Sequence, residues 1–134
     1  MTGERPEGRK AARGVRGFEL DVQLTFSQTL SRQAALEALR PWPLTTELYG
    51  PLQGGGGEVR AARLTGELGA EGLLALMRAG LEGGLLRSAE VGRRGFLRSV
   101  TGTTEWMPWR RNILVPRAEL ERVTLEDGLH YIVE

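Results

Sequence analysis

The sequence has 134 residues, which suffices for one domain with a buried core, and its formal net charge is only +1. It contains no cysteine, which excludes disulfides, thiol nucleophiles and thiolate-ligated metals. His130 is the single histidine, so a site that needs two imidazoles is excluded too, and we expect neither a metal nor a cofactor. No apolar run reaches the roughly 18 residues of a membrane span.

The first seventeen residues form a segment that differs from the rest of the chain. They carry five basic residues against two acidic ones and almost no large apolar side chain, so we expect a basic tail over 1–17 that is disordered when free. Because this segment lacks the apolar core of a secretory signal, we expect a cytoplasmic protein. The remainder, 18–134, is predicted to be a single domain. The tail residues that can contact an acidic partner are Arg5, Arg9, Lys10, Arg13 and Arg16.

Residues 18–26 give the clearest strand pattern. Apolar and polar side chains alternate over this stretch, which predicts a half-buried strand with one wet face. Ser31 then has the position of an N-cap for a short helix through Leu39, with Ala35, Leu36 and Leu39 on its inner side.

Residues 68–86 form the longest run with helical apolar spacing. Leucine and methionine recur every four residues there, which predicts a core helix despite several glycines. The side chains expected to face Leu20, Val22 and Leu24 of the first strand are Leu73, Met77, Leu81 and Leu85.

The other predicted elements are short. We expect strands at 44–49, 58–65, 88–100, 112–115 and 129–133, a helix at 116–122, a turn at 127–128 and a loop at 101–111. The element order predicts an α+β fold: a small antiparallel sheet with two main helices on one face. It corresponds to a ferredoxin-like βαββαβ order plus a C-terminal β-α-β extension.

Few residues offer chemistry of the kind that enzymes use. His130 lies in an alternating terminal strand and is predicted to be a surface or edge residue. Glu19 and Asp21 share the wet face of the first strand, where we expect them to solubilise the sheet; contact with a divalent cation or with an arginine from a neighbour is the alternative. An enzyme with an unfamiliar site around these three residues is therefore a secondary hypothesis.

The segment 87–111 is the unusual surface of this sequence. Trp106 and Trp109 flank Met107-Pro108, and Arg110-Arg111 follow directly. Tryptophan and arginine are enriched in protein-binding hot spots, and the same pair suits stacking on unpaired bases; two indoles that plug the end of the sheet are the plainer interpretation. Three further arginines add to the segment's basic charge: Arg93, Arg94 and Arg98.

These patterns predict a small non-enzymatic binding or accessory subunit of a protein assembly. It would contact an acidic protein surface through segment 87–111 and the basic tail. A nucleic-acid-binding module that uses the same residues is the first alternative, and the enzyme is the second. Self-association into a homo-oligomer also stays open, whereas no membrane partner is expected.

Overall fold

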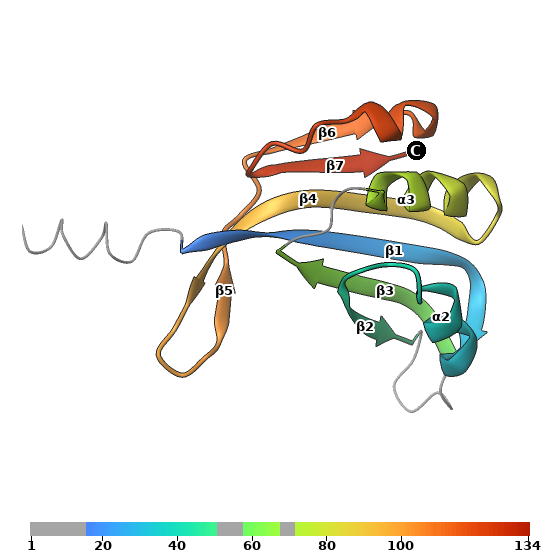
Figure 1. Cartoon of the computed structure of the whole chain (residues 1–134), viewed down its shortest axis with the longest axis horizontal. Coiled ribbons are helices and arrows are strands. Elements are labelled where there is room, and N and C mark those ends of the chain that lie inside the picture. The colour runs from blue at the N-terminus through green and yellow to red at the C-terminus, as the bar shows by residue number, and fades with distance from the viewer. Residues whose placement is uncertain (1–15, 51–57, 68–71) are drawn as a thin grey trace, which may run out of the picture.

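A computed structural model describes residues 16–50, 58–67 and 72–134 of the chain (Figure 1). These residues form a seven-stranded sheet, two α-helices and one 3-10 helix. The elements are β1 (Gly17–Ser31), α2 (Arg32–Ala38), β2 (Thr45–Tyr49), β3 (Glu58–Gly66), α3 (Leu73–Glu82), β4 (Leu86–Arg98), β5 (Thr104–Trp106), β6 (Arg111–Val115), η1 (Arg117–Arg122) and β7 (Leu129–Val133). Within these residues, no helix is long and apolar enough to cross a bilayer.

The strands lie in the order β2-β3-β1-β4-β7-β6, and β5 pairs with β4 beside this path. All pairs are antiparallel except β6 and β7, which run parallel. The prediction of a purely antiparallel sheet is therefore wrong, and the α+β class is confirmed. The physical reason is the connection: η1 and the turn at Gly128 carry the chain back to the start of β6 before β7 begins, so β7 repeats the direction of β6.

Strand β1 confirms the predicted strand at 18–26 and is longer than predicted, with fifteen residues. Its inward side chains Leu20, Val22, Leu24 and Phe26 are buried in a core that also contains residues of α2, α3 and η1. Figure 1 shows these helices on the viewer's side of the sheet. The opposite face of the sheet, called the second face below, carries the odd-numbered side chains of β1 from Glu19 to Thr25.

Helix α2 begins as predicted at the Ser31 cap, whose Oγ accepts a hydrogen bond from Ala34 N at 3.0 Å. Ala35 and Leu39 are buried, but Leu36 is 46% exposed, so its predicted inward position is wrong. A helix this short presents only a narrow stripe to the core, and Leu36 falls beside that stripe.

Helix α3 is shorter than predicted. It extends from Leu73 to Glu82, while the predicted residues 68–71 lie outside the described part of the chain. The N-cap Gly72 has φ 85° and Gly84 has φ 88°, a region that glycine enters without strain, so the glycines bound the helix on both sides. Leu73, Met77 and Leu81 are buried as expected. Leu85, predicted to share this helix face, lies beyond the end of the helix and is only partly buried.

The C-terminal elements differ from the prediction in type more than in position. The predicted loop at 101–111 contains strand β5, and the predicted helix at 116–122 is a 3-10 helix. The turn at 127–128 is confirmed, with Gly128 at φ 88°. Strand β1 already begins at Gly17, and Arg16 N donates to Phe96 O at 2.8 Å; residues 1–15 of the predicted tail lie outside the described residues.

Strand register places the side chains of the second face in rows that cross the sheet. One row, called row A, runs from β3 to β6 through Thr65, Asp21, Gly92, His130 and Asn112. The next, row B, runs from β2 to β4 through Glu47, Arg63, Gln23 and Glu90. Row C follows with Tyr49, Ala61, Thr25 and Ser88. Rows A and B contain three residues of the candidate site described below: Asp21, Arg63 and His130.

Candidate functional site

A buried carboxylate on the second face organises the arginines around it. Asp21 has a relative exposure of 2%, and both its oxygens are occupied. Arg63 donates from Nε to Oδ1 at 2.9 Å and from Nη2 to Oδ2 at 3.0 Å, and Arg94 Nη2 also donates to Oδ2. This hydrogen-bonded pairing raises the pKa of Arg63. One carboxylate therefore holds two guanidinium groups in place, which leaves the trio with excess positive charge.

Both guanidinium groups also contact indole rings. The guanidinium carbon of Arg94 lies 5.1 Å from the ring centroid of Trp106 and 4.7 Å from that of Trp109. Arg63 lies 5.4 Å from the centroid of Trp106. These distances are within the range of cation–π attraction, so the arginines and indoles restrain each other. We call Asp21, Arg63, Arg94, Trp106, Trp109 and His130 the Trp–Arg cluster.

Trp109 lies over a glycine of β4. A Cβ atom on Gly92 would come within 2.7 Å of two atoms of the indole, so only glycine lets the ring rest on this strand. The segment that carries the ring is tied at both ends: Met107 N donates to Gly95 O at 2.9 Å, and Arg110 N donates to Gly128 O at 2.7 Å. Backbone hydrogen bonds thus hold Trp109 over row A.

His130 extends the cluster across the sheet. Its ring stacks on Trp109 with centroids 4.8 Å apart and planes 9° from parallel. Nε2 lies 2.8 Å from Glu90 Oε1, and Nδ1 lies 3.0 Å from Asn112 Oδ1. The predicted edge position is wrong, because β7 lies between β4 and β6, and the side chain is partly buried, with 14% exposure.

The structure brings some of the predicted site residues together and separates others. Trp106, Trp109 and Arg94 meet in the cluster, with both indoles half-buried. Arg93 points the other way and pairs with Asp127 at 2.7 Å. Arg110 donates to the backbone oxygen of Asp127 at 2.6 Å.

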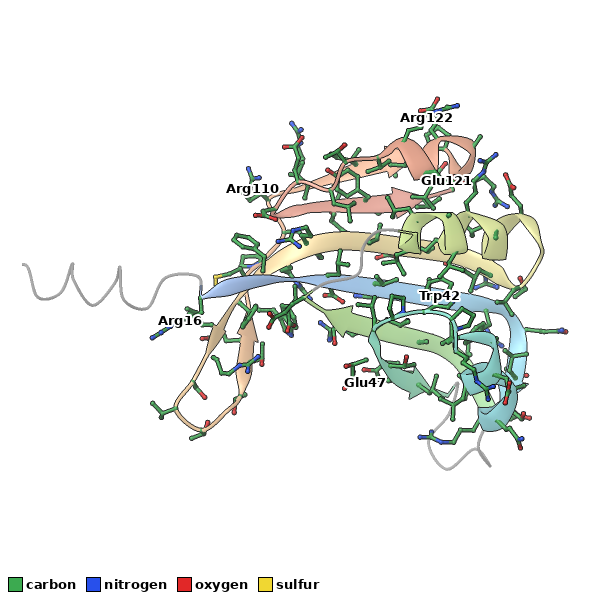
Figure 2. The ribbon with its side chains drawn as sticks, viewed as in Figure 1. Arg16, Trp42, Glu47, Arg110, Glu121 and Arg122 are labelled. Carbon is green, nitrogen blue, oxygen red and sulfur yellow. The ribbon has the colours of Figure 1, made fainter. Side chains whose placement is uncertain are left out.

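Exposed positive charge gathers at the same end of the sheet. Figure 2 shows Arg16 and Arg110 at the end where β1 begins and β5 projects. Arg98 lies 5.4 Å from the Phe96 ring, and Arg111 begins β6. Within residues 16–50, 58–67 and 72–134, Arg98, Arg110 and Arg111 form no ion pair with a carboxylate. The predicted tail contacts Arg5, Arg9, Lys10 and Arg13 lie outside the described residues.

Comparison with known protein families, with curated proteins and with solved structures finds no match to this chain. The geometry of the site itself must therefore carry the functional argument. In the described part of the chain, no group of three or more His, Asp or Glu side chains is arranged to hold a metal ion. For Asp21, a divalent cation or an arginine was the alternative to a solubilising role, and the structure shows the arginine contact.

Sequence reasoning missed the central part of this site. Asp21 was expected to solubilise a wet face, yet it is buried, and Arg63 was not singled out at all. The alternating pattern of β1 correctly placed Asp21 on the face of the sheet that points away from the core. Nothing local could identify Arg63 as its partner, because that residue comes from a strand that lies 42 positions further along the chain.

Tyr49 offers a test of the electrostatics of the second face. Its hydroxyl donates to Glu47 Oε1 at 2.8 Å, and this bond raises the pKa of Tyr49 above the ordinary 10.0. The bond favours the protonated phenol, so its contribution to stability is present below pH 10 and is lost as the pH rises through the higher folded-state pKa. Glu47→Gln is expected to lower this pKa towards 10.0.

An alkaline titration of phenolate absorbance measures this effect, with a Tyr49→Phe variant to subtract the signal of Tyr131. An unchanged titration of Tyr49 in Glu47→Gln would show that the hydrogen bond does not form in solution.

Proposed function

We propose that this protein is a non-enzymatic binding subunit that contacts an acidic surface of a protein partner through its Trp–Arg cluster and the neighbouring arginines. The observation that carries the proposal is pre-organisation. Asp21 fixes Arg94, and Arg94 lies over both indoles, so these side chains lose little conformational freedom when a partner binds. Half-buried indoles beside exposed arginines are typical of binding hot spots.

Unpaired charge beside the cluster supports an acidic partner. Arg98, Arg110 and Arg111 are exposed at this end of the sheet. In the described part of the chain, no carboxylate forms an ion pair with these arginines, so the carboxylates of a partner can pair with them directly. Such complementarity favours rapid association and weakens with added salt.

The same geometry supports the nucleic-acid alternative less well. The indoles already contact arginine and histidine side chains of this chain, which limits the ring surface left for a base. On the second face, four acidic side chains stand against three basic ones: Glu19, Asp21, Glu47 and Glu90 against Arg63, Arg94 and Arg98. A phosphate backbone laid across this face would meet repulsion.

The enzymatic alternative also finds little support. Both ring nitrogens of His130 face side-chain oxygens, those of Glu90 and Asn112, so neither is directed at a substrate. A general base needs a nitrogen within hydrogen-bond reach of the proton that it removes.

A finer description of the fold belongs to the same proposal. The strand order β2-β3-β1-β4 and its antiparallel pairs support a ferredoxin-like unit that β6 and β7 extend.

The proposal predicts that Trp106→Ala with Trp109→Ala abolishes recovery of the native partner. Each indole anchor is expected to contribute about 2 kcal/mol or more to binding. The measurement is affinity capture by the full chain from cells that express it, quantified for wild type and variants of equal melting temperature. Undiminished recovery by the double tryptophan variant would exclude the cluster as the binding surface.

Two double variants with the same change in net charge distinguish a specific contact at the basic end of the sheet from a general effect of net charge. Arg110→Glu with Arg111→Glu reverses two exposed charges beside the cluster, whereas Arg87→Glu with Arg122→Glu reverses two exposed charges elsewhere. Only the first double variant should fail to recover the partner.

Fluorescence anisotropy of a fluorescein-labelled oligothymidylate tests the nucleic-acid alternative. Tight binding, with a logarithm of the association constant that falls steeply with the logarithm of the salt concentration, would favour nucleic acid.

A further inference from the structure

The second face has a hollow with a volume of about 270 Å³, and neither indole of the Trp–Arg cluster lines it. It forms because row C has small side chains on β3 and β1: Ala61 pairs with Thr25 on one side and with Tyr49 on the other. The side chains that line it are Gln23, Thr25, Tyr49, Ala61, Arg63 and Glu90.

Two opposite charges stand on opposite walls of this hollow. Gln23 pairs in register with Arg63 on β3 and with Glu90 on β4, so the two charged residues are two strand spacings apart, about 10 Å between Cα atoms. Arg63 bonds Asp21 through Nε and Nη2, and Glu90 contacts His130 through Oε1. Within the described residues, these contacts do not use Arg63 Nη1 or Glu90 Oε2; Arg63 also interacts with the Tyr49 hydroxyl and lies in register beside Glu47.

Further polar groups converge on the same space. In the described part of the chain, the side chains of Gln23 and Thr25 form no hydrogen bond. The Tyr49 ring is held as a wall by its bond to Glu47. A concave site with a small apolar floor and a few convergent polar groups has the features of a ligand site.

We propose that this hollow binds a small zwitterion, an amino acid whose carboxylate and ammonium groups stand at opposite ends of a short chain. The carboxylate accepts hydrogen bonds from Arg63 Nη1, and the ammonium group donates to Glu90 Oε2. The methylene chain lies against Ala61 and Tyr49. A ligand that is only anionic faces Glu90, and one that is only cationic faces Arg63, so the lining favours the molecule that carries both charges.

Three probes of matched chain length test the charge requirement: δ-aminovalerate, pentylamine and valerate. Each is titrated into the isotopically labelled full chain, and amide shifts are followed by NMR. We expect δ-aminovalerate to bind at least an order of magnitude more tightly than either of the others and to shift the amides of β1, β3 and β4. Equal binding of pentylamine or of valerate, or no saturable shift at millimolar δ-aminovalerate, would overturn the proposal.

Variants locate the site. Glu90→Gln keeps the shape of the wall and removes its charge, so it should weaken δ-aminovalerate at least ten-fold and strengthen valerate, whose carboxylate no longer faces a like charge. Ala61→Leu should fill the hollow and abolish binding of all three probes. Glu105→Gln removes an exposed carboxylate from β5 and serves as the matched control, with binding unchanged. If Ala61→Leu does not fold, Glu90→Gln alone decides, and full affinity for δ-aminovalerate in Glu90→Gln contradicts the proposed site.

Discussion

Asp21→Asn is expected to lower the free energy of unfolding by about 3–5 kcal/mol, the range for removal of one partner from a buried ion pair. The substitution leaves Arg63 and Arg94 beside each other without the carboxylate that both bind. Arg94 Nε already lacks a hydrogen-bond partner in the described part of the chain, so we expect no other acceptor to compensate this guanidinium group for the loss of the Asp21 carboxylate. Urea denaturation monitored by circular dichroism measures the change.

Asp127→Asn is the matched control for this prediction. It makes the same chemical change at an ion pair with Arg93 in which both side chains are substantially exposed, where about 0–1 kcal/mol is expected. Tryptophan fluorescence gives a second measurement, because release of Arg94 should also free Trp106 and Trp109 and alter their emission. Equal effects of the two substitutions would mean that Asp21 is not a buried anchor in solution.

Leu81→Ala is expected to destabilise the fold by about 2–5 kcal/mol, because it leaves a cavity in a core that relaxes only in part. Leu81 is 3% exposed and shares the core cluster with Leu20, Val22 and Leu24 of β1. It lies near the end of α3, which packs against β4 and η1.

Leu36→Ala is the control, since it removes the same atoms from a side chain that is 46% exposed. Surface substitutions of this kind change stability by about 0.5 kcal/mol or less. The midpoint of urea denaturation should therefore separate the two leucines clearly. A loss at Leu81 no greater than that at Leu36 would show that this face of α3 is not core.

Local pattern predicted the elements whose signals lie within a few residues. The alternation of β1 and the Ser31 cap of α2 depend on neighbouring side chains, and both are confirmed. The spacing of Leu73, Met77 and Leu81 likewise identified a buried helix face. The extent of that helix was overestimated, because glycines at 72 and 84 adopt positive φ values that periodicity does not reveal.

Segment 87–111 shows where local pattern stops being informative. Its composition marked Trp106 and Trp109 as unusual, but their contacts depend on strands from distant parts of the chain. Strand β5 forms only because β4 offers it an edge, and β7 runs parallel to β6 only because η1 returns the chain. Such pairings are non-local and leave no mark in a short window of sequence.

The sequence by itself determined the α+β class and the apolar faces of β1 and α3, because burial and helix capping follow from local spacing. Its composition alone showed the richness in arginine. Only the tertiary structure decided that Asp21 is buried between Arg63 and Arg94, that Trp109 rests on Gly92, and that Arg63 and Glu90 face one hollow. Strand order and register, which join residues far apart in the chain, bring these groups together.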